Sequence, residues 1–489
     1  MTPPDTPLND PIPRPRATLQ MRDRMVRDDG LKAALLDRVV EVQADLVPEG
    51  SRAAIADFTR KAFAHVAPDD LSRRSVGHLA HAAISLWQFS QERGGANGAN
   101  GANGDGGAKI RIFTPETEEA GWTARASLIQ IVNADMPFLV DSVTAALQRL
   151  GLTLKLVVHP VLRVSRDDAG QLLEVAPALE GEITGPGEDL GLESIMHIEI
   201  NRTTDQERQD TIIRRLRSVL DDVRAAVNDW GAMRALCADL ADRIGGDDDD
   251  EQITEAQAFL TWAADNHFTF LGYRHYQFEG DSTGMSLLIN HADGLGILKD
   301  QAYSVFDGLR NFQQLPVNAQ ELFRRENPLF LTKSNRPATV HRAVPMDAII
   351  IKERDSGGNT IGEHLFVGLF TSIAYNRSAR DIPYLRAKVQ RAIAAAGLPE
   401  QSHTGKALAH ILDTYPRDEL FQMTDDELLD IATGVLHLTE RPRVALFIRR
   451  DPFDRFVSCM VYVPRDRYDT SLRQRWQRVL EAEFGAEVS

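Results

Sequence analysis

The turn from Asn133 to Phe138 holds the residues best suited to bind a small molecule. Pro137 is typical of the first residue of a helix, so the backbone N–H groups after it would be unpaired and would attract a carboxylate. Asp135 before the helix and Asp141 in its first turns could receive an ammonium group. This pattern suits an α-amino acid, unless the two aspartates only favour the positive end of the helix. The candidate binding residues are Asn133, Asp135, Phe138, Leu139 and Asp141.

The stretch from Gly280 to Gly284 matches the G-x-S-x-G pattern of a hydrolase with Ser282 as its nucleophile. That chemistry needs a strand-to-helix turn, whereas both flanks here have the pattern of strands. A hairpin loop explains the same residues. A hydrolase that loses activity in Ser282→Ala is therefore an alternative, and we assign no catalytic residue in this chain.

Two glycine motifs are incomplete as nucleotide-binding sites. Gly294-Leu295-Gly296 begins a dinucleotide fingerprint, but Lys299 stands where the third glycine belongs, which indicates a turn. Gly405-Lys406 lacks both the upstream glycine and the hydroxyl residue of a phosphate loop. We therefore expect no cofactor to bind within this stretch.

The charged side chains do not predict a metal site. His197 and Glu199 lie on one face of an expected strand, yet no second His or Cys pair is near them in the sequence. We therefore expect a solvated strand face there and assign no metal. Aspartates and arginines are densely mixed between positions 449 and 469, a pattern that more often makes a surface ion-pair lattice or a subunit contact than a phosphate site.

The composition indicates a folded protein of a reducing compartment. The chain has 489 residues, enough for two to four domains, of which 43% are hydrophobic and 26% charged. Its net charge of −16 disfavours nucleic acid or an anionic membrane as the main partner. Cys237 and Cys459 are its two cysteines. Because the N-terminus lacks a signal-peptide pattern and no stretch is apolar enough to span a bilayer, we expect a soluble, cytoplasmic protein.

The elements that must position the Asn133 turn form an α/β pattern. We interpret residues 1–17 as a flexible tail, 18–93 as a helical lead-in and 94–108 as a Gly/Ala/Asn linker. From 109 to 230, a strand, a helix, two strands and a helix follow in order. That is the order of a ferredoxin-like sandwich, in which helices cover one face of an antiparallel sheet.

The second half begins after a helix end and acidic spacer at 231–252. Residues 253–400 have the pattern of a β-rich middle domain, whose fold the pattern does not identify. Residues 401–489 combine helices with two strands and a last helix. This last α/β unit lacks a closing strand, which suggests that the polypeptide was cut from, or continues into, something longer.

Several ordered stretches resemble the N-terminal region of the large, bacterial type of NAD-specific glutamate dehydrogenase. The matching stretches are Asp135-Met136-Pro137-Phe138-Leu139-Val140-Asp141-Ser142, Val158-His159-Pro160, Met196-His197-Ile198-Glu199, Asn266-His267-Phe268-Thr269-Phe270-Leu271-Gly272-Tyr273, Tyr415-Pro416-Arg417-Asp418-Glu419-Leu420-Phe421, Arg449-Arg450-Asp451-Pro452-Phe453, Arg455-Phe456-Val457-Ser458-Cys459 and Tyr462-Val463-Pro464-Arg465-Asp466. They extend over most of the chain.

The resemblance implies an α/β (α+β) fold with ACT-like modules, one at 109–230 and a truncated one at 401–489. ACT-like modules are associated with amino-acid sensing and subunit contacts. The resemblance also implies a parent enzyme that converts L-glutamate, NAD and water to 2-oxoglutarate, ammonia and NADH. Such an enzyme would bind NAD outside this stretch and would form a homo-oligomer through its ACT-like and middle domains.

One residue departs from the family pattern. The ACT modules that bind amino acids resemble one another in a glycine at the turn into the first helix, and Phe138 fills the corresponding stretch here. A bulky side chain would close the pocket, which favours a structural or oligomerisation role for this module. The leading hypothesis is a regulatory and assembly region without a catalytic site of its own, and the alternative is a free-standing amino-acid sensor.

Overall fold

The computed structural model describes residues 16–93, 107–116, 122–177, 191–245, 250–279, 286–300, 303, 305, 327–399, 401–486 and 488. Most of the predicted tail and linker, part of the acidic spacer and the stretch Gly280 to Gly284 lie outside these residues. The chain forms two compact units, which we describe separately. The first unit holds Met1–Val223 with Thr339–Arg342, and the second holds Arg224–Ala338 with Ala343–Ser489.

The first unit begins with the helices expected between residues 18 and 93. They are α1 (Arg16–Leu46), α2 (Arg52–Ala62), α3 (Pro68–Ser72) and α4 (Val76–Ser90). Helix α4 starts at a serine cap, because Ser75 Oγ accepts a hydrogen bond from the N–H of His78. The side chains of Leu79, Ala83 and Leu86 are buried, so α4 presents an apolar face to a partner.

That partner is an antiparallel sheet. Its elements in chain order are β1 (Lys109–Phe113), β2 (Ala126–Ala134), α5 (Leu139–Arg149), β3 (Leu154–Val158), β4 (Val161–Arg166), β5 (Leu172–Pro177), β6 (Gly191–Asn201) and α6 (Gln206–Arg243). The strand order is β1-β2-β6-β4-β5, and β3 also pairs with β6. The predicted strand and helix order from β2 to α6 is confirmed, with β3 and β4 as two segments beside β6 and β5 as an additional hairpin strand.

The edge strand β1 fills a place that the sequence pattern did not predict. It pairs antiparallel with β2, with Ile110 opposite Ile131 and Ile112 opposite Ile129. A ferredoxin-like sheet needs a fourth strand beside its first one, and in a β-α-β-β-α-β order that strand follows the second helix. Here the strand beside β2 is β1, which precedes β2 in the chain. The fourth strand of the sheet therefore comes from the N-terminal side of the module.

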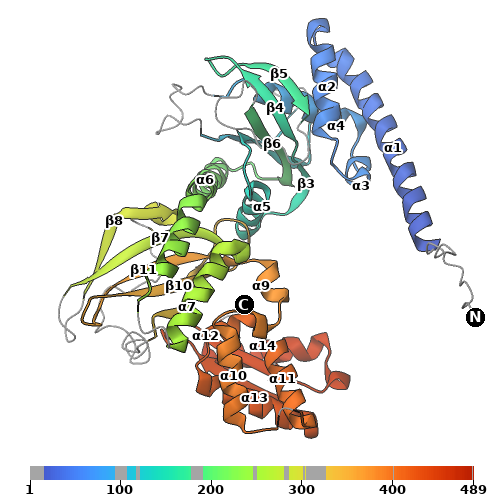
Figure 1. The fold of residues 1–489 in the computed structure, drawn as a ribbon. Helices are drawn as coiled ribbons and strands as arrows, with labels where there is room; N and C mark the ends of the chain where they lie inside the picture. Colours follow the sequence, from blue (N-terminus) through green and yellow to red (C-terminus); the bar gives the residue numbers. More distant parts are fainter. Residues whose placement is uncertain are drawn as a thin grey trace, which may run out of the picture. The chain divides into compact units, whose positions relative to one another are not determined.

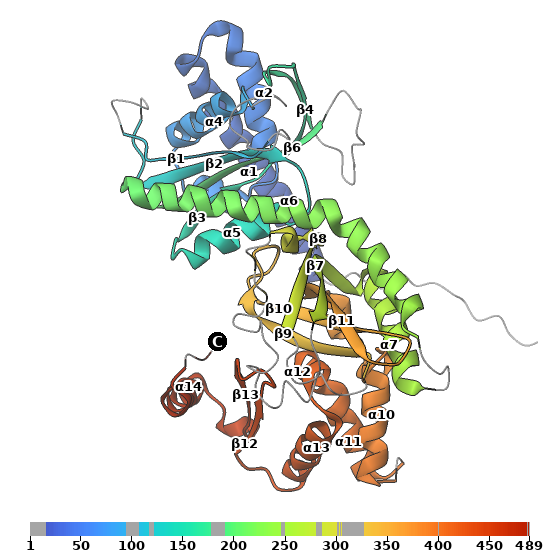
Figure 2. The ribbon, with the colours of Figure 1, turned by 90° about the vertical axis from the view of Figure 1, so that its left-hand side faces the viewer.

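Helices cover both faces of this sheet, whereas helices on one face were expected (Figure 2). Leu128 packs with residues of α4, and Val132 lies in a core with residues of α2 and α4. Ile129 and Ile131, which alternate with them along β2, are also fully buried, and α5 and α6 lie on that opposite side. The helical lead-in is therefore packed on the sheet as part of the same unit.

The second unit is built on a five-stranded antiparallel sheet in the order β8-β7-β11-β10-β9. The strands are β7 (Phe268–Glu279), β8 (Ser286–Gly296), β9 (Leu329–Pro337), β10 (Pro345–Arg354) and β11 (Thr360–Phe370). All five lie within residues 253–400, where the sequence pattern predicted a β-rich stretch. The C-terminal half of α6 and helix α7 (Glu251–Trp262) run along the sheet (Figure 1) and share one core with it, in which Cys237, Phe259 and Phe366 are fully buried.

Further helices complete the second unit. They are α9 (Ser372–Asn376), α10 (Leu385–Ala396), α11 (His403–Thr414), α12 (Arg417–Gln422) and α13 (Asp425–Glu440), followed by β12 (Ala445–Arg450), β13 (Val457–Tyr462) and α14 (Thr470–Phe484). Short 3-10 or π turns occur at η1 (Glu49–Ser51), η2 (Ala263–His267), η3 (Ile297–Lys299), η5 (Ala379–Asp381) and η6 (Arg465–Arg467). Within the described ranges, no helix is both long and apolar enough to cross a membrane.

Candidate functional site

The helix start at the Asn133 turn differs from the prediction. Helix α5 begins at Leu139 rather than at Pro137, and Phe138 is the residue that precedes it. Phe138 has φ 71° and ψ 2°, a left-handed conformation that costs a non-glycine residue on the order of 1 kcal/mol. The backbone at Phe138 therefore has the shape that a glycine adopts most easily, although the side chain is a phenyl ring.

The segment Thr339–Arg342, which belongs to the same compact unit, lies against this helix start. The rings of Phe138 and His341 pack with their centroids 4.9 Å apart. The backbone N–H of His341 donates to Ser142 Oγ at 2.9 Å, and its ring nitrogen Nδ1 lies 3.1 Å from Asp141 Oδ2. A ligand at this helix start would therefore have to move the Phe138 ring or the His341 segment.

The other predicted binding residues have different surroundings. Asn133 is buried and donates from Nδ2 to the carbonyl of Ala134 at 2.9 Å, and Leu139 is buried in the core. Partial burial raises the pKa of Asp135, against the effect of a hydrogen bond from the N–H of Met136. Of the five predicted binding residues, only Asp135, Phe138 and Asp141 are therefore at least partly exposed, and their role in ligand binding stays a prediction.

The His197 and Glu199 pair is buried, so the expected solvated strand face is wrong. His197 is 1% and Glu199 4% exposed, because α3, α4 and the residues between them cover this face of β6. Arg74 donates to both carboxylate oxygens of Glu199 from Nε at 3.0 and 2.9 Å and from Nη2 at 2.7 Å. His78 Nε2 lies 2.7 Å from the same carboxylate. A second histidine is therefore close in space, but Arg74 already donates hydrogen bonds to both oxygens of the carboxylate.

The charges of this cluster follow from those contacts. Burial alone would raise the pKa of Glu199, but hydrogen bonds from His78 and Arg74 outweigh it and hold the pKa at about 2. Gln130 Oε1 accepts from Arg111, so the Gln130 amide nitrogen must be the donor to His197 Nδ1, 3.2 Å away. Burial lowers the pKa of His197 to about 4, so its ring is neutral at pH 7. Glu199 is thus a structural anion held by a fixed cation.

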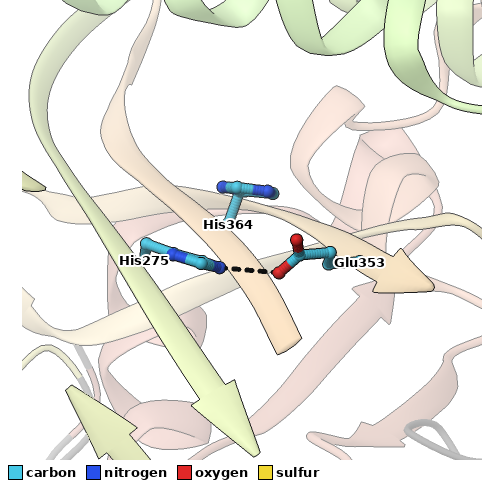
Figure 3. Close-up of side chains that lie close together, drawn as sticks. All are labelled: His275, Glu353 and His364. Carbon is cyan, nitrogen blue, oxygen red and sulfur yellow. Dashed lines mark hydrogen bonds and ion pairs between the residues drawn. The ribbon is translucent and has the colours of Figure 1, made fainter. Parts of the chain in front are cut away.

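A second cluster of histidine and glutamate lies on the sheet of the second unit (Figure 3). His275 on β7 is directly opposite His364 on β11, and their rings stack with centroids 4.5 Å apart and planes 11° from parallel. His275 Nε2 donates to Glu353 Oε2 on β10 at 2.8 Å. Tyr273 Oη lies 2.8 Å from His364 Nδ1. Four side chains from three adjacent strands thus form one hydrogen-bonded and stacked row.

The sequence pattern did not predict this second cluster. It indicated a β-rich stretch at 253–400, and alternation along β7 puts Tyr273 and His275 on one face. Glu353 is 78 residues from His275, and only the pairing register of β7, β11 and β10 brings the three together. Strand alternation could have shown which face each side chain takes, but not which residues lie opposite one another.

The glycine motifs have structural roles. Gly294-Leu295-Gly296 forms the last three residues of strand β8, so the predicted turn is wrong for these residues, and a 3-10 turn follows at η3. The N–H of Gly296 donates to Asp229 Oδ2 at 2.7 Å. A Cβ at Gly296 would lie 2.1 Å from the carbonyl oxygen of Leu271, so no other residue fits there. Gly405-Lys406 lies inside helix α11.

The mixed charges near the C-terminus are partly buried, so the expected surface lattice is wrong for its main pairs. Arg449 pairs with Glu419 at 2.7 Å, and Arg455 pairs with Asp451 at 2.8 Å. The Arg449 side chain is 2% and the Asp451 side chain 0% exposed. Arg455 Nη2 also donates to Thr332 Oγ1 on β9 at 2.6 Å. Arg449 therefore joins β12 to α12, and Arg455 joins the segment after β12 to the sheet of the second unit.

Comparison with known proteins gives matches to three domains of glutamate dehydrogenase. The ACT1 domain of glutamate dehydrogenase matches residues 58–216, its helical motif 1 matches residues 382–441, and its ACT2 domain matches residues 445–489. The ACT1 match includes helices α3 and α4, and the helical motif match contains α10 to α13. The domain limits given by the sequence analysis stay a prediction.

Three curated proteins named NAD-specific glutamate dehydrogenase are similar to most of this chain. The protein from Halomonas elongata is 34% identical over 94% of this chain and 28% of its own length. The one from Pseudomonas aeruginosa is 32% identical over 86% of this chain and 25% of its own length, and the one from Mycobacterium tuberculosis is 31% identical over 73% and 21%. This chain thus spans about a quarter of the length of these relatives. With three domain matches in order and these relatives, the chain belongs to the family of NAD-specific glutamate dehydrogenases.

Proposed function

We propose that this chain is a regulatory and oligomerisation region of an NAD-dependent glutamate dehydrogenase that acts in the cytoplasm. The observation that carries the proposal is the succession of ACT1, helical motif 1 and ACT2 matches along one chain. The parent enzyme would convert L-glutamate, NAD and water to 2-oxoglutarate, ammonia and NADH. Its glutamate and NAD sites would lie outside this stretch, and copies of the protein would associate through the ACT-like and middle domains.

The decisive experiment is on the whole gene product. The reading frame that encodes this chain is expressed in full, and glutamate-dependent NADH formation is measured with and without residues 1–489. We expect activity in the full product, with altered assembly by light scattering and altered regulation by amino acids when the region is removed. A full product that forms no NADH from glutamate, or a reading frame that holds no NAD-binding domain after Ser489, would contradict the proposal.

The Asn133 turn contributes to this function as a closed helix start. The left-handed Phe138 and its ring contact with His341 occupy the place where an amino-acid carboxylate would approach the N–H groups of α5. An assembly role for the module follows more directly from this arrangement than an effector site does. An amino acid would enter only after Phe138 moves.

Calorimetry with a panel of amino acids separates the assembly role from the alternative of a free-standing amino-acid sensor. The unchanged chain should give no binding heat with any amino acid. Phe138→Gly removes the ring and relieves the left-handed strain, so it is the variant most able to gain binding. Micromolar binding by the unchanged chain would support the sensor and contradict the closed turn.

A further inference from the structure

The geometry points to a Zn²⁺ site formed by His275, Glu353 and His364 in the second unit (Figure 3). The three side chains come from the adjacent strands β7, β10 and β11. One nitrogen or carboxylate oxygen of each lies within 4.8 Å of the other two. Two imidazoles and one carboxylate are a donor set that Zn²⁺ takes with a fourth position left for water or another ligand.

The sheet register fixes the backbone of all three ligands. His275 lies directly opposite His364, and Glu353 lies opposite Gly362, two residues before His364 on the same strand face. Tetrahedral zinc with bonds of about 2.0–2.2 Å places its ligand atoms roughly 3.4 Å apart. The His275 Nε2 to Glu353 Oε2 distance of 2.8 Å lies below that value, and the upper limit of 4.8 Å for the cluster lies above it. To close the site, the ligand atoms must therefore shift by up to about 1.4 Å, and one of the two stacked imidazoles must turn, because a metal binds in the plane of each ring.

Gly362 leaves space beside the carboxylate. A Cβ at this position would lie 2.8 Å from Glu353 Oε2 and 3.4 Å from His275 Nε2. The Glu353 side chain is 30% exposed, whereas that of His275 is 11% exposed. An ion can therefore reach the cluster from solvent on the carboxylate side, while the imidazoles hold it from the buried side.

The hydrogen bonds determine which ring nitrogens are available to a metal. Tyr273 Oη engages His364 Nδ1 at 2.8 Å, which leaves His364 Nε2 for an ion and supplies the outer hydrogen bond that zinc-binding histidines usually have. His275 donates its Nε2–H to Glu353 in the metal-free form. When Zn²⁺ binds at Nε2, this proton moves to Nδ1 of the same ring or is released to solvent.

The surrounding charges permit a cation. The charged groups that act on His364 are the acidic Glu353 and Asp293 and the basic Arg243 on α6. Within the part of the chain that the structure describes, no lysine or arginine forms an ion pair with Glu353. The carboxylate charge is therefore available to the metal.

Titration of the complete 489-residue chain with Zn²⁺, after chelator treatment, tests the site. We expect one Zn²⁺ per chain in calorimetry whose affinity falls by at least about 100-fold in His275→Asn and in His364→Asn. Tyr273→Phe keeps both ligands and should reduce the affinity by about 10-fold. Co²⁺ in place of Zn²⁺ should give the strong visible absorption of a tetrahedral site in the unchanged chain but not in His275→Asn or His364→Asn.

Controls are needed because the chain has 13 histidines. His403→Asn removes an exposed histidine at the start of α11 and should leave the affinity unchanged. Glu353→Gln keeps the shape of a partly exposed side chain, so it should fold normally by circular dichroism and still lose the tight site. Zn²⁺ affinity that is the same in the unchanged chain and in Glu353→Gln and His275→Asn would overturn the proposal and leave the row as a hydrogen-bonded ladder only.

Discussion

Each unit of this chain has a buried histidine beside a glutamate on the face of a sheet, and the two clusters differ in what neutralises the carboxylate. In the first unit, Arg74 and His78 both donate to Glu199, which is 4% exposed. In the second unit, Glu353 accepts from His275, and its side chain is 30% exposed. The first carboxylate has a permanent cation, Arg74, as partner, whereas the second has only a histidine.

The difference shows why residue types alone do not identify a metal site. A carboxylate already held by a guanidinium fork has its lone pairs filled and its charge offset, so it contributes to stability. A carboxylate held by a single imidazole keeps a lone pair and its charge for a second cation. The predictions below test this distinction through the stability of each unit.

The largest effect is expected at Glu199. Glu199→Gln leaves the Arg74 guanidinium buried without an anion, and we expect a loss of about 3–5 kcal/mol in the opening free energy of the first unit. Because the pKa of Glu199 is held at about 2, below its ordinary 4.5, its stabilisation is present above pH 4.5 and is lost as the pH falls toward 2. Hydrogen exchange of the β6 amides at pH 7 and pH 3 measures both effects.

The matched control for Glu199 is Glu174→Gln on β5. Glu174 is exposed, so its substitution should change the exchange of β6 by less than about 0.5 kcal/mol. If Glu199→Gln were as mild as Glu174→Gln, the arginine-held carboxylate would not be a structural anion.

A third carboxylate, Glu363, shows the effect of burial that a neighbouring cation does not offset. It lies next to His364 on β11, is 4% exposed, and its Oε2 has no hydrogen-bond partner among the described residues. Burial raises its pKa to about 8, against the charge of Lys352. The folded state therefore keeps a proton that the unfolded state loses, so stability falls as the pH rises from 4.5 to 8.

Glu363→Gln removes that pH dependence because the amide does not titrate. At pH 8 we expect the unfolding free energy of the second unit to be about 4 kcal/mol higher in the variant than in the unchanged chain, and near pH 4 we expect the two to be equal. Urea denaturation at the two pH values measures the difference. If Glu363→Gln raised the unfolding free energy equally at both pH values, Glu363 would not be protonated in the folded chain.

Much of the fold could be predicted from sequence, because a helix or strand that buries one face has apolar residues at a regular spacing. The strands β2 and β6 and the helix α5 all appear where apolar residues alternate or recur at helical spacing. The place of β1 could not be predicted, since pairing with β2 is decided by which edge of the sheet is free. The packing of α4 on the second face of the sheet could not be predicted either, because α4 is far from β6 in sequence.

The candidate sites were less predictable than the elements that carry them. Phe138 adopts a backbone shape that its residue type disfavours, and the contacts that accompany it come from His341, about 200 residues away. The burial of Glu199 depends on Arg74 from another element. The row of His275 and Glu353 depends on strand register, which the residue types alone do not determine.

A smaller effect is expected at Tyr273. Tyr273→Phe removes the hydrogen bond between Tyr273 Oη and His364 Nδ1 in a buried site, and we expect a loss of about 1 kcal/mol in the second unit. Urea denaturation in the presence of chelator measures it without metal. Tyr468→Phe, at an exposed tyrosine, should have no measurable effect. A loss of several kcal/mol in Tyr273→Phe would mean that the row is a rigid structural network like that of Glu199.

The smallest effect is expected at Glu353, the counterpart of Glu199. In metal-free protein, Glu353→Gln should cost less than about 1 kcal/mol, because the side chain is partly exposed and its amide oxygen can still accept from His275 Nε2. No buried arginine is left unpaired by the change, which is the reason for the contrast with Glu199→Gln. Urea denaturation with chelator compares the two variants directly. Equal losses in both would mean that Glu353, like Glu199, is needed to hold its sheet together, and its carboxylate would then not be available to a metal.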